Sequence, residues 1–213
     1  VEITVAIKDG EILAEKTMNG RLGIRGGLSV LGTTGIVIPY SCASWIHSIH
    51  RGVDVARAGG LSHIAAATGS TSEAAVKALY DMSDMALIDM GDFAGGLLKY
   101  LRRHPLPRLT IAGGFGKLAK LAQGNLDLHS ARSSLDLKKL AALAGDDRDL
   151  AERIAAANTG MEALTLAQAV GVPIADRVAQ GAREVALAAL AGDVAVEVLV
   201  FDRQGQLAGR AGG

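Results

Sequence analysis

Small and hydroxyl-bearing residues recur directly after short apolar runs in the first half of the chain. Gly32-Thr33-Thr34-Gly35 follows the run 28–31, and Thr68-Gly69-Ser70 follows the run 64–67. Glycine lets a ligand approach the backbone closely, and the hydroxyl groups can form hydrogen bonds with that ligand. Each segment therefore predicts either a binding turn for a small polar molecule or a tight turn that serves only its own backbone geometry.

Two carboxylates lie at the end of the third apolar run. Asp89 and Asp92 flank Gly91 at the end of the run 85–90. Carboxylates at the end of a strand can bind ribose hydroxyls or orient the amine of a substrate. We expect such a role for both, with the alternative that Asp92 serves only as the N-cap of the helix that follows.

Lysine and histidine side chains gather after the fourth run. The segment 114–119 fits a relaxed dinucleotide-binding pattern, but that pattern normally follows the first strand of a sheet and is paired with an acidic residue after the next strand. Lys117 and Lys120 precede the polar loop 124–130, in which His129 could act as acid, base or hydrogen-bond donor near neutral pH. The alternative is a solvated loop that caps a helix.

The helix expected over 41–58 carries Cys42, Trp45, His47 and His50. The two histidines lie three residues apart on one helical face, but no carboxylate or further histidine nearby would complete a metal site. We therefore expect surface or core histidines, no bound metal, and a tryptophan that anchors the helix in the core. A single cysteine excludes an internal disulfide and a multi-cysteine zinc site.

These residues need elements to position them, and the sequence predicts an α/β fold. Short apolar runs without alternation are typical of parallel strands buried on both faces, and here they alternate with helical segments. This order favours a mostly parallel, doubly wound, Rossmann-like sheet with the glycine-rich turns at its carboxyl edge, where open α/β sheets bind ligands. An N-terminal hairpin is predicted at Asp9-Gly10 with its second arm from Ile12, and a helical last third leads to a strand over 194–201. We expect one domain over 1–204 and a flexible tail over 205–213.

The composition excludes several classes of protein. With 22 basic and 22 acidic residues, the 213-residue chain lacks the basic excess that nucleic-acid binders use against phosphates. No uncharged apolar run reaches the roughly 18 residues of a membrane span, and the N-terminus has no signal-peptide pattern. We expect a soluble cytoplasmic protein with no nucleic-acid or membrane partner, and an opening in mid-strand that continues a longer polypeptide.

Three segments, in this order, resemble the cobalt-precorrin-5B C1-methyltransferase (CbiD) family of anaerobic-type cobalamin biosynthesis. Residues 21–37, with Gly32-Thr33-Thr34-Gly35 at their centre, are similar to the family's main signature, and Gly91-Asp92-Phe93 resembles its Gly-Asp-Phe motif. Residues 116–130 resemble a third family segment, and the resemblance covers about residues 1–200. The family's N-terminal portion is not in this chain. The resemblance therefore implies a C-terminal part, with its own N-terminal domain or a second copy as a partner.

The resemblance also implies a reaction, the transfer of a methyl group from S-adenosylmethionine to ring carbon C1 of a cobalt-bearing tetrapyrrole. The donor needs polar anchors, and the substrate carboxylates need cations. The residues expected in the site are Gly32, Thr33, Thr34, Gly35, Thr68, Gly69, Ser70, Asp89 and Gly91 for the donor, Arg21, Arg25, Lys117 and Lys120 for the substrate, and Asp92 and His129 for catalysis. Two alternatives stay open: a donor- or tetrapyrrole-binding part that is inactive without the N-terminal portion, and a dinucleotide-binding oxidoreductase.

Overall fold

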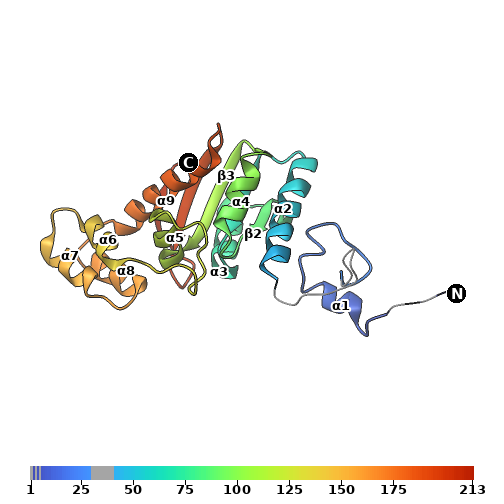
Figure 1. The fold of residues 1–213 in the computed structure, drawn as a ribbon, viewed down its shortest axis with the longest axis horizontal. Helices are drawn as coiled ribbons and strands as arrows, with labels where there is room; N and C mark the ends of the chain where they lie inside the picture. The colour runs from blue at the N-terminus through green and yellow to red at the C-terminus, as the bar shows by residue number, and fades with distance from the viewer. Residues whose placement is uncertain (1, 3, 5, 30–40) are drawn as a thin grey trace.

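The structure, a computed structural model, describes residues 2, 4, 6–29 and 41–213. Five strands in this part of the chain form one sheet in the order β2-β1-β3-β4-β5 (Figure 1). The strands are β1 (His63–Ala67), β2 (Leu87–Asp89), β3 (Arg108–Gly114), β4 (Ala195–Phe201) and β5 (Leu207–Ala211). The first four pair in parallel, and β5 pairs antiparallel with β4. The predicted α/β class and mostly parallel sheet are confirmed.

Helices connect the strands and build the segment between β3 and β4. They are α1 (Gly10–Ala14), α2 (Cys42–Ala58), α3 (Ser70–Tyr80), α4 (Ala94–Leu101), α5 (Phe115–Ala122), α6 (Leu137–Ala141), α7 (Arg148–Ala155), α8 (Gly160–Ala169) and α9 (Ile174–Leu190), with 3₁₀ turns at Asp84–Ala86 and Ala142–Ala144. Residue types that favour helix N-termini stand at the beginning of two of these helices. The hydroxyl of Ser41 accepts a hydrogen bond from the backbone N–H of Ser44 at the start of α2, and Pro173 directly precedes α9. Figure 1 shows α6, α7 and α8 gathered at the end of the molecule opposite α2.

The sheet separates two hydrophobic cores. Ile64 and Ile111 belong to the larger core, which the sheet shares with α2, α4, α5 and α9. Ala65 and Ala112, the next residues along the same strands, belong to the smaller core with α3. All four side chains are fully buried. Because successive residues of a strand point to opposite faces, both faces of this sheet need apolar side chains, which explains the runs without alternation.

Two boundary predictions are wrong. The second arm of the predicted hairpin, from Ile12, is not a strand, because Gly10–Ala14 forms the short helix α1. The residues that follow Asp9-Gly10 include glutamate, leucine and alanine, which favour helix over strand. The tail predicted to be flexible over 205–213 contains β5, which completes the edge of the sheet beside β4.

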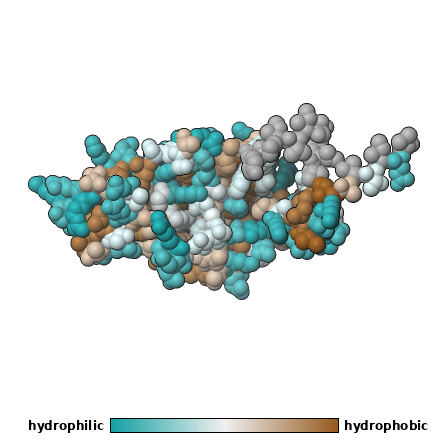
Figure 2. Space-filling model, turned by 90° about the horizontal axis from the view of Figure 1, so that it is seen from below, coloured by the Kyte–Doolittle hydropathy of each residue, from teal (hydrophilic) through white to brown (hydrophobic). Residues whose placement is uncertain are grey.

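The surface is mixed in character. Figure 2 shows hydrophilic and apolar residues interspersed over one face of the molecule. Among the helices of the described residues, none is both long enough and apolar enough for a membrane span. The apolar side chains of Ile12 and Leu13 on α1 are among those exposed.

Candidate functional site

Three strand ends meet at the carboxyl edge of the sheet. Thr68 follows β1, Gly91 and Asp92 follow β2, and Gly114 ends β3. The backbone fixes their positions, since the N–H of Thr68 donates to the carbonyl of Ala112, and the N–H groups of Met90 and Gly91 donate to that of Ala67. The predicted turns after these three runs therefore lie side by side. The remaining predicted turn, Gly32-Thr33-Thr34-Gly35, lies outside the described residues.

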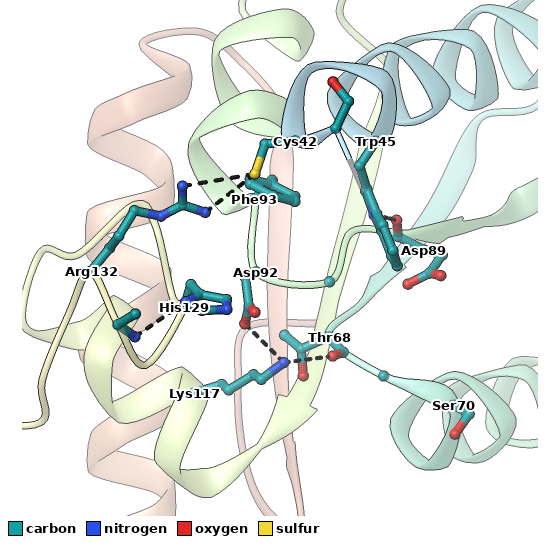
Figure 3. Close-up of a pocket in the computed structure, with 14 residues that line it drawn as sticks. Cys42, Trp45, Thr68, Ser70, Asp89, Asp92, Phe93, Lys117, His129 and Arg132 are labelled. Carbon is teal, nitrogen blue, oxygen red and sulfur yellow. Dashed lines mark hydrogen bonds and ion pairs between the residues drawn. The ribbon is translucent and has the colours of Figure 1, made fainter. Parts of the chain in front are cut away.

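A first cavity of about 620 Å³ opens at this edge. Of the predicted site residues, Thr68, Gly69, Ser70, Asp89, Gly91, Asp92, Lys117 and His129 line it. Figure 3 shows the side chains of Thr68 and Asp92 just after β1 and β2, with those of Ser70 on α3, Lys117 on α5 and His129 on the loop after α5. The tertiary structure thus gathers into one space residues that span about sixty positions of the sequence.

A second cavity of about 780 Å³ adjoins the first. The two share a wall, here called the shared wall, formed by Thr68, Gly69, Ser70, Asp92, Lys117 and His129. The second cavity adds Lys120, predicted from the sequence, and Arg203, which lies after β4 and was not predicted. Two ligands bound in these cavities would therefore meet at the shared wall.

Lys117 lies in the first turn of α5 and joins two strand ends. Its Nζ donates to the carbonyl of Thr68 at 3.1 Å and lies 2.9 Å from Oδ1 of Asp92. The contact with Asp92 is an ion pair rather than a directed hydrogen bond, so the buried Oδ1 makes no hydrogen bond within the described residues. A buried carboxylate oxygen with spare acceptor capacity is suited to receive a donor group from a ligand.

The alternative role of Asp92 as a mere helix cap is wrong. Helix α4 begins at Ala94, its N-cap position is Phe93, and no side chain caps it. Asp92 instead faces Lys117, and its backbone carbonyl accepts the N–H of Leu128 at 2.8 Å. This residue therefore holds the end of β2 against both α5 and the loop that carries His129.

Asp89 ends β2 and is half-buried at the first cavity. Burial, and next the negative charge of Glu73, raise the pKa of Asp89 above its ordinary value, while Arg21 opposes them. Arg21 is itself occupied, because its two terminal nitrogens bind the Glu73 carboxylate at 2.8 and 2.7 Å. Arg21 and Arg25 line neither cavity, and Arg25 is exposed.

The loop after α5 presents His129 to both cavities. Lys120 supports the loop by donating to the carbonyl of Leu128 at 3.1 Å. The Nδ1 atom of His129 accepts the backbone N–H of Ala131 at 3.1 Å. Because Nδ1 is occupied as an acceptor, Nε2 is the ring nitrogen that His129 can offer to a ligand as a hydrogen-bond donor.

Trp45 is the clearest correction to the sequence prediction. Its side chain is 46% exposed and lines the first cavity instead of anchoring α2 in the core. The other lining residues that sequence reasoning did not place in the site are Ser41, Cys42, Phe93, Ala131 and Arg132. The signal that could have found Trp45 is its position in the first turn of the helix that follows Gly32-Thr33-Thr34-Gly35.

The metal and dinucleotide alternatives gain no support. No group of three or more His, Cys, Asp or Glu residues suited to a metal exists in the described part of the chain, and the ring of His50 stacks on Tyr100 with centroids 4.0 Å apart. An acidic residue, Asp202, does follow β4, which pairs with β3. Its Oδ1 accepts the backbone N–H groups of Gln204 and Gln206, so this carboxylate shapes the β4–β5 turn.

Comparisons with known proteins agree on one family. Residues 127–212 match a family model described as "CbiD, C-terminal domain", and residues 1–39 match one described as "CbiD". Proteins of Brucella canis and Brucella suis named "Cobalt-precorrin-5B C(1)-methyltransferase" are 58% identical over 212 residues, or 98% of the chain. The chain spans 58% of the length of these relatives. A crystal structure of a cobalamin biosynthesis protein (cbiD) from Archaeoglobus fulgidus is 28% identical over 58% of the chain and 39% of that protein, with a TM-score of 0.29.

Proposed function

The chain belongs to the CbiD family, and we propose that it transfers a methyl group from S-adenosylmethionine to carbon C1 of a cobalt-precorrin tetrapyrrole. The names of the Brucella relatives support this reaction. Because the chain spans little more than half of those relatives, the activity of the longer protein is carried over to it as a proposal.

The single observation that carries the proposal is the pair of adjoining cavities at the carboxyl edge of the sheet. A transfer between two small molecules needs two binding spaces that meet at the reacting atoms, and the shared wall provides such a meeting point. Open α/β sheets bind their ligands at this edge. We assign the donor to the first cavity and the tetrapyrrole to the second.

The first cavity suits a cationic donor. S-adenosylmethionine carries its methyl group on a positively charged sulfonium. When the methyl group is transferred, the sulfur departs as a neutral thioether and needs no acid. Two basic residues also line this cavity, but Lys117 is paired with Asp92 and Arg132 with Asp127. Asp89 adds a carboxylate, and the buried Oδ1 of Asp92 has acceptor capacity for an amine or hydroxyl. Gly69 and Gly91 let a ligand lie close to the backbone at the ends of β1 and β2.

The second cavity suits a polycarboxylate. Lys120 and Arg203 line it beside the Lys117–Asp92 pair, and the N-termini of α3 and α5 lie at the same edge. The carboxylate of Asp202 also lines this cavity, but it accepts backbone N–H groups of the β4–β5 turn. Ammonium and guanidinium groups bind carboxylates strongly, and a helix N-terminus adds partial positive charge. Arg21 was expected to share this role, but its charge is balanced by the ion pair with Glu73. We assign Arg203 in its place.

Catalysis in this site is chiefly a matter of position. Lys117 and Asp92 fix each other at the shared wall, so a donor and an acceptor bound on either side are held at a defined distance. His129 presents an Nε2–H group to a carboxylate or ring nitrogen of the substrate. We assign to His129 the orientation of the tetrapyrrole, and to Asp92 the orientation of the donor.

Several finer expectations belong to the same proposal. A doubly wound, Rossmann-like description suits a sheet with helices on both faces. A cytoplasmic location suits an enzyme that uses a metabolic methyl donor. The rival form of the function is a binding part that becomes active only with the N-terminal portion of the longer protein or with a second copy.

Calorimetric titration of S-adenosylhomocysteine, with a transfer assay on cobalt-precorrin-5B, tests the proposal. We expect binding by the chain and a loss of affinity of roughly tenfold in Asp92→Asn, because one charge-assisted hydrogen bond is removed. Glu152→Gln is the matched control, since Glu152 is exposed and lines neither cavity. Binding without transfer would favour the rival form, and equal affinity in both variants would contradict the site.

A further inference from the structure

Trp45 is the one tryptophan of the chain, and it is unusually exposed for its residue type. It lies in the first turn of α2, is 46% exposed, and lines the first cavity. Tryptophan is usually highly buried because it offers more apolar surface than any other side chain. A tryptophan left open at a cavity wall is suited to cover a flat, apolar ligand group.

The indole is held in one orientation. Its Nε1 donates to the backbone carbonyl of Asp89 at 3.1 Å. Gly91 lies against the ring with φ of +54°, a left-handed conformation that favours glycine, and an added Cβ there would be 3.4 Å from the indole. Phe93 lies beside it at 6.4 Å between centroids. Figure 3 shows the ring of Trp45 standing next to Asp89 at the side of the pocket away from Arg132.

Trp45 also has a defined position along the first cavity. Trp45 and Asp89 line the first cavity and not the second, whereas the shared wall lies between the two. If the methyl group passes between ligands at the shared wall, the donor's sulfonium lies at that wall. Two arms extend from the sulfonium, the adenosyl group and the aminocarboxypropyl group of methionine. Only the adenosyl group has an aromatic ring for an indole to stack on and ribose hydroxyls for a carboxylate to accept, so it is the arm that suits Trp45 and Asp89.

We propose that the indole of Trp45 stacks on the adenine of the methyl donor, and that the carboxylate of Asp89 accepts the ribose hydroxyls. This inference rests on the proposed function and assigns one part of the donor to one part of the cavity. Stacking of a base on an aromatic side chain corresponds to about 10- to 100-fold in affinity. The shared wall then receives the methionine part, close to Asp92 and Lys117.

Because the chain has a single tryptophan, tryptophan emission reports on this site alone. The experiment titrates S-adenosylhomocysteine, adenosine and methionine separately into the chain, with emission of Trp45 as one readout and calorimetry as the other. We expect S-adenosylhomocysteine and adenosine to change the emission, because both carry the base. Methionine is expected to leave the emission unchanged, because its site is at the shared wall.

Two variants separate stacking from general packing. Trp45→Leu keeps an apolar side chain without an aromatic face, and we expect it to weaken S-adenosylhomocysteine at least tenfold. Trp45→Phe keeps a smaller ring, and we expect an intermediate affinity. Leu79→Ala is the matched control, because Leu79 is 49% exposed and lines neither cavity. Circular dichroism of each variant establishes that it is folded.

The outcomes distinguish the inference from the function on which it rests. Calorimetric binding of S-adenosylhomocysteine that is equal in wild type and Trp45→Leu would overturn the inference and leave the proposed function standing. An emission change with methionine but not with adenosine would reverse the orientation of the donor, and so overturn it too. No calorimetric binding by the folded chain would overturn both.

Discussion

The Nζ atom of Lys117 lies 2.9 Å from Oδ1 of Asp92, in a contact that joins the first turn of α5 to the end of β2. The same ammonium donates to the carbonyl of Thr68 at the end of β1. One side chain thus holds two neighbouring strand ends at the wall between the two cavities. Its removal should disturb both the geometry of the site and the balance of charge there.

Lys117→Met is expected to lower methyl transfer at least roughly tenfold and to lower the free energy of unfolding by about 1 kcal/mol, since Asp92 loses its counter-ion. Urea unfolding and the transfer assay measure the two effects. In an Asp92→Asn background the same substitution should cost less stability, because no charge is left unpaired. Strictly additive effects in the double variant would mean that the pair is not coupled. Lys99→Met, at an exposed lysine outside both cavities, is the control.

Asp89→Asn is expected to weaken donor binding yet to stabilise the fold at neutral pH. Burial raises the pKa of Asp89, so the folded state binds its proton more tightly than the unfolded state does. This contribution to stability is present at low pH and is lost as the pH rises through the raised pKa, starting near the ordinary value of about 3.9. The gain at pH 7 should not exceed about 1 kcal/mol, because solvent screens part of the charge.

Urea unfolding of wild type and Asp89→Asn at pH 4 and pH 7 checks this sign. The stability difference should be larger at pH 7. A variant that is less stable than wild type at neutral pH would show that the carboxylate supports the fold. Donor affinity of the wild type should fall as the pH is lowered, and this fall should begin at a higher pH than for an ordinary aspartate.

Glu197→Gln is expected to destabilise the fold by about 2–3 kcal/mol. Glu197 is 1% exposed in β4 and accepts hydrogen bonds from Tyr80 at 2.6 Å, Thr110 at 2.9 Å and Arg210 at 2.7 Å. Burial alone would raise the pKa of Glu197, but these donors and Arg108 outweigh it, so the pKa lies below its ordinary value.

Because the pKa of Glu197 is lowered on folding, its contribution to folding stability depends on pH in the opposite sense to that of Asp89. The stabilisation by Glu197 is present above the unfolded pKa of about 4.3 and is lost as the pH falls through the folded value. Wild type and Glu197→Gln should therefore approach each other in stability toward low pH, as thermal unfolding would measure. Glu197 lines neither cavity, so a folded variant that lost donor affinity would contradict the separation of this network from the site.

Arg203→Ser and Lys120→Met are expected to raise the KM for the tetrapyrrole roughly tenfold each and to leave S-adenosylhomocysteine affinity unchanged, because both residues line only the second cavity. Steady-state kinetics and calorimetry separate the two ligands. Lys138→Met, on α6 and outside both cavities, is the control. Parallel losses of donor affinity would contradict the assignment of the second cavity to the substrate.

Much of the fold follows from local pattern. The run 64–67 predicted β1, the helix predicted over 41–58 is α2, and the strand predicted over 194–201 is β4. The last strand was missed because its glycines suggested flexibility. At Gly209 an added Cβ would lie 2.6 Å from the backbone nitrogen of Asp176, so this glycine is there because α9 packs directly against β5. A glycine required for close packing and a glycine in a mobile tail look the same in a sequence.

The sequence by itself determined that polar residues end successive buried strands, and parallel pairing then brings Thr68, Gly91 and Asp92 to one edge. Only the tertiary structure decided which side chains meet there. It brings Arg203 from the end of β4 to the second cavity, turns Trp45 toward the first, and pairs Arg21 with Glu73 on α3. Periodicity records which face of an element is apolar, because burial acts on each residue separately. Contacts between distant segments depend on strand order and on how helices pack across the sheet, and these are set by all the elements together.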